Sequence, residues 1–222
     1  MAVIRGGVSG NLAEVSADGA IYFKEKETET FLGTYQAEIV TAAIQNTTAH
    51  TVNTQGFAWA FNPSTSGVIV KLERVGLQIA QTTAVAAGFP TAPRIIISKF
   101  TYTGTPSGAT VAFTGTGSTQ GKFDANYPTA ILDWRTAITG ATCTYGHSLF
   151  STMAPAIPIV GTVTTSQIAG MVSDNEYQPR ESEYEHVVRP GEGIVIWQPE
   201  VGSTGDTRKL VTRIFWEEVT IP

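Results

Sequence analysis

The chain has a single cysteine, Cys143, among its 222 residues, so a disulfide framework within the chain is excluded. A domain of this length buries about 70% of its unfolded surface and needs neither cross-links nor a metal to fold. Charged residues are also scarce, at 15% of the sequence, against about 25% in an average soluble protein. Helices cover their outer faces with such residues, so this shortage excludes a largely helical protein.

An excess of basic residues is lacking as well, since 14 Lys and Arg stand against 19 Asp and Glu. Nucleic-acid binding needs clustered positive charge to neutralise phosphates, so we expect no nucleic-acid partner. No segment approaches the roughly 18 consecutive apolar residues of a membrane helix, and the first ten residues lack the apolar run of a secretory signal. We therefore expect a chain that is made in a cytoplasm and has no membrane partner.

The chain is instead rich in threonine, at 32 positions, and in other residues that suit a pleated strand. From Thr34 onward, short β-like runs alternate with turns of Gly, Pro and Asn. At least six strands are expected, and the predicted fold is an all-β, antiparallel β-sandwich of jelly-roll-like type over residues 31–222. The candidate runs are 34–43, 57–61, 68–79, 95–102, 156–163, 184–188, 194–198 and 209–221.

Two local patterns give more specific predictions. Large aromatic residues alternate with alanine over 57–61, a turn follows at 62–67, and a long apolar run covers 68–79, which together predict a hairpin. The segment 129–138 has apolar residues at helical spacing and is compatible with a short helix, although its threonine content weakens that interpretation.

The first 30 residues differ in texture from the rest. Residues 1–20 hold four glycines and only short apolar pieces, and a charged run follows at 24–29. This composition predicts an extended N-terminal arm and edge segment over 1–30. A polar segment that protects a sheet edge and an arm that binds a neighbour both fit the pattern.

The residue spacings in this sequence do not match those of known catalytic, cofactor-binding or metal-binding motifs. The glycine-rich run 115–123 has neither the glycine spacing of a phosphate loop nor a hydroxyl residue after Lys122. Cys143 and His147 would lie about 13 Å apart on a strand, which is too far for proton transfer. We therefore expect no enzyme, no cofactor and no metal site.

Glu181, Glu183 and Glu185 alternate along the chain, so an extended strand would place three carboxylates on one face. Such groups serve glycoside hydrolysis or calcium binding in some proteins, but an acidic outer strand face is the commoner explanation.

The aromatic residues admit a weak sugar-binding hypothesis. Three of the four tryptophans lie in apolar β runs, where core packing is expected. The four are Trp59, Trp134, Trp197 and Trp216. Aromatic residues in loops would be better platforms for a sugar, and the candidates are Tyr102, Tyr127 and Tyr145.

The two ends of the chain carry a resemblance. Residues 6–20, GGVSGNLAEVSADGA, resemble an N-terminal segment of the kind GG-x-SGN-x-AEV-x-A that is found in many structural proteins of tailed bacteriophage virions. Residues 190–196, PGEGIVI, together with the long run that ends in FWEE at 215–218, are similar to the C-terminal hairpin of the same group.

The resemblance implies a β-sandwich that decorates the phage head, or belongs to the neck or tail, and acts by binding without turnover. Its expected location is the virion, and its expected partners are the major capsid protein, neighbouring virion proteins and further copies of itself. The arm would lend backbone hydrogen bonds to a partner, with Val8, Asn11, Leu12 and Val15 as contact residues. A receptor- or glycan-binding sandwich of a tail or fibre remains an alternative, and a hydrolase is a third.

Overall fold

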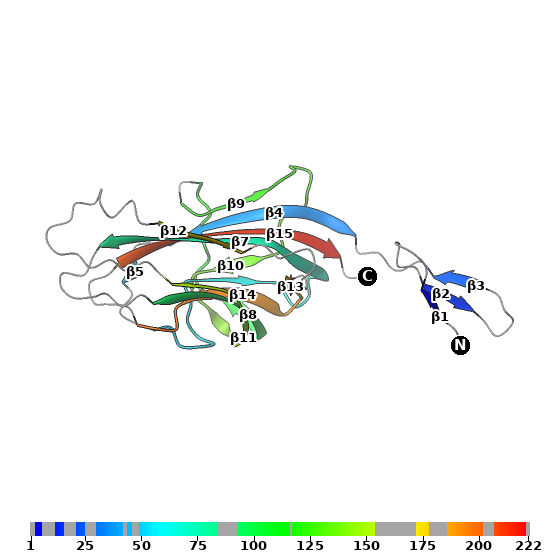
Figure 1. Cartoon of the computed structure of the whole chain (residues 1–222), viewed down its shortest axis with the longest axis horizontal. Coiled ribbons are helices and arrows are strands. Elements are labelled where there is room, and N and C mark those ends of the chain that lie inside the picture. Colours follow the sequence, from blue (N-terminus) through cyan, green and yellow to red (C-terminus); the bar gives the residue numbers. More distant parts are fainter. Residues whose placement is uncertain are drawn as a thin grey trace.

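The computed structural model describes residues 3–5, 12–15, 21–24, 30–41, 44–45, 49–83, 93–115, 117–153, 172–177, 186–201 and 207–220. Every regular element in these ranges is a β-strand, and all paired strands run antiparallel. None of the described residues forms a helix long and apolar enough to cross a membrane. Two sheets pack face to face, which confirms the predicted β-sandwich (Figure 1).

The larger sheet is organised around two long central strands, β7 and β15, which pair with each other over most of their length. Its main strand order is β12-β7-β15-β4-β9, while β13 also pairs with β7 and β5 with β15. The strand bounds are β4 (Phe31–Val40), β5 (Ile44–Gln45), β7 (Val68–Thr83), β9 (Thr119–Lys122), β12 (Val172–Tyr177), β13 (His186–Val188) and β15 (Thr207–Thr220).

The smaller sheet has the order β10-β6-β14-β8-β11. Its strands are β6 (Ala58–Phe61), β8 (Arg94–Ser107), β10 (Asp133–Arg135), β11 (Thr139–Met153) and β14 (Glu192–Trp197). Beyond β8 the chain returns to β10, where Val111 N–H donates to Trp134 O (3.0 Å) and Thr136 N–H donates to Ala109 O (3.0 Å). The sheet therefore curls back at this end, and the chain after β8 covers the edge of β10.

The smaller sheet is buried on both of its faces, as β6 shows most clearly. Ala58 and Ala60 face the core between the two sheets, whereas Trp59 and Phe61 belong to a second apolar cluster on the opposite face. Short alanines let the larger sheet approach closely, and the rings beyond them pack edge to face, with centroids 5.4 Å apart for Trp59 and Phe100. The alternation over 58–61 thus divides the residues between two cores, while Phe57, just before β6, packs against the inter-sheet core.

The burial of all four tryptophans confirms the expectation that they pack in the core. Their exposed fractions are 1% for Trp59, 3% for Trp134, 9% for Trp197 and 0% for Trp216. Trp216 lies in the inter-sheet core, stacked on Tyr35 at 5.7 Å, and its indole N–H donates to the buried carboxyl of Glu218 (2.9 Å). Burial raises the pKa of Glu218, although the hydrogen bonds from Trp216 and from Ile131 N–H oppose that rise.

The predicted hairpin over 57–79 is wrong in its pairing, although both strands exist. β6 pairs with β10 and β14 in the smaller sheet, and β7 pairs with β12, β13 and β15 in the larger one. The six residues 62–67 cross from one sheet to the other, a longer connection than the two- to five-residue loops of ordinary hairpins.

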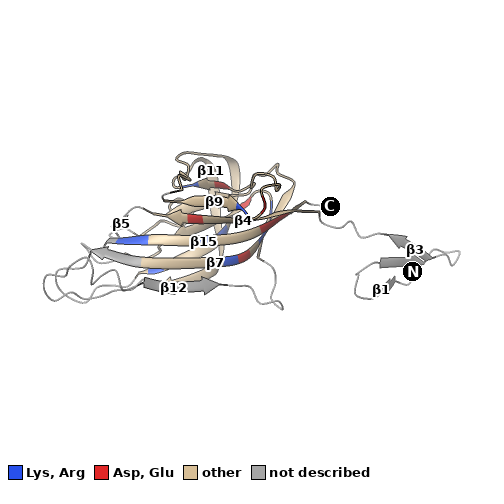
Figure 2. Ribbon diagram, turned by 90° about the horizontal axis from the view of Figure 1, so that it is seen from above, with Lys and Arg blue, Asp and Glu red and all other residues tan. Residues whose placement is uncertain are grey.

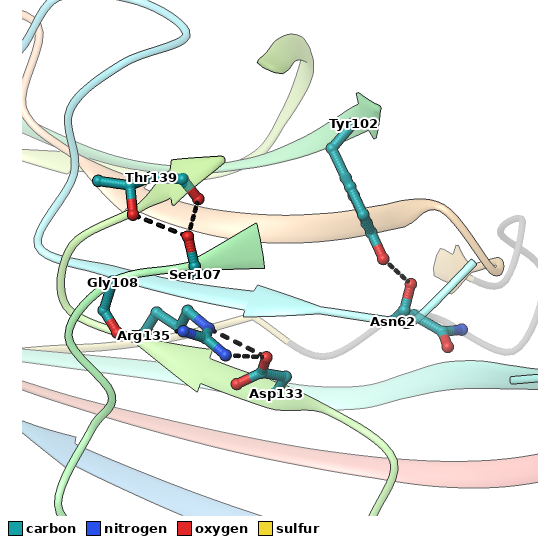
Figure 3. A network of polar contacts seen from close by, with 7 residues as sticks. All are labelled: Asn62, Tyr102, Ser107, Gly108, Asp133, Arg135 and Thr139. Carbon is teal, nitrogen blue, oxygen red and sulfur yellow. Dashed lines mark hydrogen bonds and ion pairs between the residues drawn. The ribbon is translucent and has the colours of Figure 1, made fainter. Parts of the chain in front are cut away.

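The helix suggested for 129–138 is also wrong, because the segment contains strand β10. Leu132 and Trp134 are buried, whereas Asp133 and Arg135 between and after them are partly exposed, so the apolar period is two and not 3.6. The Arg135 guanidinium binds the Asp133 carboxylate (2.7 Å) and donates to Gly108 O (3.1 Å), which fastens the returning chain to β10 (Figure 3).

Asn62 joins the two sheets where β6 ends, and it is fully buried. Its side-chain amide donates to Val68 O at the start of β7 and to Val188 O at the end of β13, both at 2.9 Å. Its side-chain oxygen accepts from the Ser66 hydroxyl at 2.7 Å.

The backbone of Asn62 binds the smaller sheet. Its N–H donates to Glu192 O, and its carbonyl accepts from Gly191 N–H and from the Tyr102 hydroxyl at 2.7 Å (Figure 3). All hydrogen-bonding groups of this one residue are therefore satisfied by both layers of the sandwich.

Replacing Asn62 by alanine is expected to lower the free energy of unfolding by about 2–4 kcal/mol. Asn62→Ala leaves two buried carbonyls without the amide that bonds them, and each such group costs roughly 1–3 kcal/mol. Equilibrium unfolding in urea measures the loss. The control is Ser66→Ala, which removes one donor and should cost about 1 kcal/mol or less; equal losses for the two variants would show that the amide does not bridge the sheets.

Candidate interaction site

A rigid turn follows β9 and carries an exposed aromatic ring. The Lys122 ammonium donates to Ala125 O (2.9 Å) and to Tyr127 O (2.6 Å), while the Asp124 carboxylate accepts from Asn126 N–H (2.9 Å). Tyr127 N–H closes the turn on Asp124 O (3.1 Å). These bonds hold the turn in one conformation, with Phe123 at its base and 60% exposed.

Phe123 lies against the outer face of the larger sheet. Its ring centroid is 6.2 Å from that of Phe215 on β15, and the Arg74 guanidinium of β7 lies 5.6 Å from the Phe215 ring. Phe215 points outward, because its neighbours Ile214 and Trp216 are fully buried in the inter-sheet core. We call Phe123, Phe215 and Arg74 the outer patch.

The outer patch has the composition of a binding hot spot. Aromatic rings and arginine dominate the energetics of protein interfaces, and a ring held by a rigid turn loses little conformational entropy on binding. Near the patch, Arg213 of β15 pairs with Glu38 of β4 at 2.6 Å across the strands. Figure 2 looks down on this sheet and shows basic residues at one end of β15 and acidic residues at the other.

A second exposed ring lies near the start of β4. Phe31 is 49% exposed and meets the half-buried Tyr127 edge to face at 5.7 Å. Tyr127 lies directly over Gly33, where a Cβ would stand 2.7 Å from the Tyr127 ring. Glycine at this position is what lets the turn after β9 pack down on β4.

A cleft of about 470 Å³ lies at the end of the sandwich where β4 finishes. Its walls are mainly apolar, and no charged side chain is among its described lining residues, which include Ile39, Phe57 and Val111. The Ser118 hydroxyl at its side accepts from Val40 N–H (2.9 Å) and so joins β4 to the start of β9. The described walls offer an apolar hollow and no group suited to acid–base chemistry.

Cys143 and His147 have different surroundings on β11. Cys143 is buried in the second apolar cluster, and burial raises the pKa of its thiol to about 11. The register of β11 shifts between Tyr145 and Ser148, and His147 in this bulge is exposed, with its ring 6.2 Å from that of His186. Glu181, Glu183 and Glu185 lie outside the described residues.

The glycine-rich run 115–123 contains a strand, with Thr119–Lys122 paired to β4 as β9. This position at the rim of the larger sheet explains the polar, small-residue composition. What sequence reasoning missed was the ring that follows the run, since Phe123 stands between Lys122 and Asp124 without any periodic pattern around it.

The three tyrosines proposed as loop platforms are not open rings. Tyr102 is buried, and its hydroxyl donates to Asn62 O. Tyr145 is half-buried, packs against Trp59 and Trp197, and its hydroxyl donates to Gln55 O (2.6 Å). Tyr127 is half-buried over Gly33, so the exposed aromatic residues of the described chain are Phe31 and Phe123.

The loop before β6 also closes the edge of β11. Asn53 adopts a left-handed conformation (φ 73°), which asparagine tolerates, and its side-chain oxygen accepts the outward Tyr145 N–H. Together with the Gln55 bond, this contact occupies the middle of a 15-residue edge strand. The edge of β11 is thus unavailable for pairing at that point.

The N-terminal residues form a small sheet of their own. β1 (Val3–Arg5), β2 (Leu12–Val15) and β3 (Ile21–Lys24) pair in the order β1-β2-β3, and the picture draws them apart from the sandwich (Figure 1). Among the expected contact residues, Val8 and Asn11 lie outside the described ranges, whereas Leu12 and Val15 begin and end β2.

The middle strand of this small sheet, β2, is bonded on both sides, so its backbone groups are engaged within the chain. Within the small sheet, β1 and β3 each pair with β2 alone among the described strands.

No protein-family model and no curated protein matches this chain.

The thiol of Cys143 is expected to react at least about 100-fold more slowly with an aqueous disulfide reagent in the folded protein than in urea at pH 8. Burial blocks access, and the raised pKa leaves little thiolate. The released chromophore measures the rate. His147→Ala should leave the folded-state rate unchanged, and fast labelling that depends on His147 would restore the cysteine–histidine pair as a candidate.

Proposed function

We propose that this protein is a non-enzymatic structural component of a virion, which binds and reinforces the capsid and attaches partly through its N-terminal sheet. The observation that carries the proposal is the division of the chain into a folded sandwich and a separate three-stranded sheet. The segment with the resemblance to phage structural proteins, residues 6–20, spans β2 and its flanks.

The small size of the N-terminal sheet supports an attachment role. Its strands have three or four residues each, and sheets of this size need a further packed layer to be stable in water. A partner surface would supply that layer. The charged run at 24–29 that joins the sheet to the sandwich is rich in Lys and Glu, as suits a solvated connection.

The partly covered edges of the smaller sheet support an assembly role for a different reason. The returning chain at 109–111 covers β10, and the loop before β6 covers the middle of β11. A protein that crowds on a particle surface benefits from edges that cannot pair at random.

Deletion of residues 1–24 is expected to abolish saturable co-sedimentation with particles that lack the protein. The sandwich has its own core, so its thermal midpoint should change by no more than a few degrees. Sedimentation at moderate and high salt, with quantification against the major shell protein, measures binding. Full-length protein that fails to bind, or truncated protein that binds with the same stoichiometry, would contradict the proposal.

A glycan- or receptor-binding role is a second candidate, and the outer patch favours it. An exposed aromatic ring beside an arginine is a suitable platform for a sugar or for a receptor surface. The patch lies on the sandwich, so this role does not depend on the N-terminal sheet.

Under this second candidate, Phe123→Ala should weaken binding to host glycans about tenfold or more, as loss of a central aromatic hot spot does. Titration calorimetry with host-surface glycans measures the loss. The matched control is Phe31→Ala, which removes the other exposed ring and should have no effect. Wild-type protein that binds no host glycan, or equal losses for both variants, would remove this candidate.

A further inference from the structure

The loop before β6, residues 49–57, is folded into one hydrogen-bonded turn. Gln55 N–H donates to Thr51 O (3.2 Å), and Thr51 N–H donates to the side-chain oxygen of Gln55 (3.0 Å). Thr54 N–H also donates to Thr51 O (3.3 Å). Because these bonds tie the residues of the loop to each other, we expect the loop to open as one unit.

The start of this loop is attached to the end of β14 through His50 and Gln198. His50 N–H donates to Gln198 O (2.7 Å), and His50 Nδ1 accepts from Gln198 N–H (3.1 Å). The imidazole packs against the Phe57 ring, with centroids 4.4 Å apart, and Phe57 N–H donates to Ile196 O (2.7 Å). The His50 ring therefore contacts both ends of the loop.

The hydrogen bond to Nδ1 requires a neutral imidazole. In the neutral ring one nitrogen carries a hydrogen and the other accepts, whereas both nitrogens donate in the imidazolium ion. A proton on Nδ1 would set two donors against each other and leave Gln198 N–H without its acceptor. Gln198 is only 1% exposed, so water has little access to replace the lost bond.

The surroundings of His50 favour the neutral ring. Burial lowers the pKa of His50 from its ordinary value of 6.5, and no charged group of the described chain contributes to that shift. The stability that the neutral ring contributes is therefore present above pH 6.5 and is lost as the pH falls below that value.

The other titratable groups around the loop are already engaged. The Glu200 carboxylate, two residues beyond Gln198, is bound by the Arg94 guanidinium of β8 at 2.6 Å. Tyr145 of β11 contacts the middle of the loop, and burial raises the pKa of its hydroxyl, which therefore stays neutral. Of these groups, the His50 ring is the one whose protonation removes a bond between the loop and β14.

The middle of the same loop covers the edge of β11. The Asn53 side-chain oxygen accepts from Tyr145 N–H, and Gln55 O accepts from the Tyr145 hydroxyl (2.6 Å). β11 is the edge strand of the smaller sheet, so the N–H groups on its outer side have no neighbouring strand. Release of the loop would leave the Tyr145 N–H without its partner.

We propose that His50 is an acid-sensitive latch, because protonation of its imidazole breaks the bond from Gln198 N–H, releases the loop 49–57 and uncovers the middle of the β11 edge. In the neutral state the loop is closed and the edge is covered. In the protonated state the Tyr145 N–H is open to solvent or to a strand of another chain. This inference concerns the sandwich alone and does not depend on capsid binding.

Amide hydrogen exchange of the full-length chain, followed by NMR at about pH 7.5 and about pH 4.5, tests the proposal. The rate for Tyr145 N–H, divided by the intrinsic rate at the same pH, gives the fraction of time that the loop is open. This fraction should rise at least about tenfold at the lower pH, as expected for loss of a hydrogen bond from a buried group. Tyr102 N–H, which donates to Gly191 O, should stay protected and would report any general unfolding.

Two substitutions separate the role of the ring from that of its nitrogen. His50→Asn keeps an acceptor oxygen near the position of Nδ1 but does not titrate, so the open fraction should be equal at both pH values. His50→Phe keeps a ring beside Phe57 without an acceptor, so the open fraction should already be raised about tenfold at the higher pH. His147→Ala removes the histidine of β11 and should leave the wild-type response unchanged.

An equal open fraction of the wild-type loop at both pH values would overturn the proposal. A pH response that His50→Asn retains in full would also overturn it, and would assign the response to another group, such as Glu200. Thermal unfolding checks that each variant is folded. The wild-type protein provides a test that needs no variant, since the NMR titration of the His50 ring and the opening of Tyr145 N–H should share one midpoint, and clearly different midpoints would refute the latch.

Discussion

The buried carboxamide of Asn62 is the contact on which the arrangement of the two layers depends. A β-sandwich core is held by apolar packing, which is non-directional and allows the sheets to slide. Asn62 adds direction, because its amide reaches two carbonyls of the larger sheet while its backbone and Tyr102 belong to the smaller one. The Asn62 side chain bonds Ser66 in the 62–67 connection and Val68 at the start of β7, and its backbone bonds the turn at Gly191.

A second constraint is that the smaller sheet packs apolar side chains on both of its faces. Apart from Trp134, its strands give mainly small and aliphatic residues to the core between the sheets, whereas most of its aromatic rings belong to the second cluster on the other face. Gly193 illustrates how tight this is, since a Cβ there would stand 2.4 Å from the Phe100 ring. Ile138, Ala141 and Tyr145 pack against the second cluster, and the loop that contains Asn53 and Gln55 bonds to Tyr145.

The strands themselves could be predicted, because β-branched and aromatic runs such as 194–198 and 209–221 have no other plausible form. The pairing of these strands could not be predicted. β6 and β7 are separated by the buried Asn62, and one of its hydrogen-bond partners, Val188, is more than a hundred residues away in the chain. The segment 129–138 was assigned a helix wrongly because the spacing of Ile131, Leu132 and Trp134 is compatible with both a helix and a strand. Pairing with β6 is what makes this segment a strand. Phe123 could not be recognised, since exposure of one ring depends on the turn that Lys122 holds.

The left-handed Asn53 limits how a strand of another chain could pair with β11. This 15-residue strand lies at the edge of the smaller sheet, where backbone groups are open to an incoming strand. The Asn53 side-chain oxygen occupies the outward Tyr145 N–H, and Gln55 O accepts from the Tyr145 hydroxyl. An incoming strand would therefore have to displace the loop before β6 before it could pair with the middle of β11.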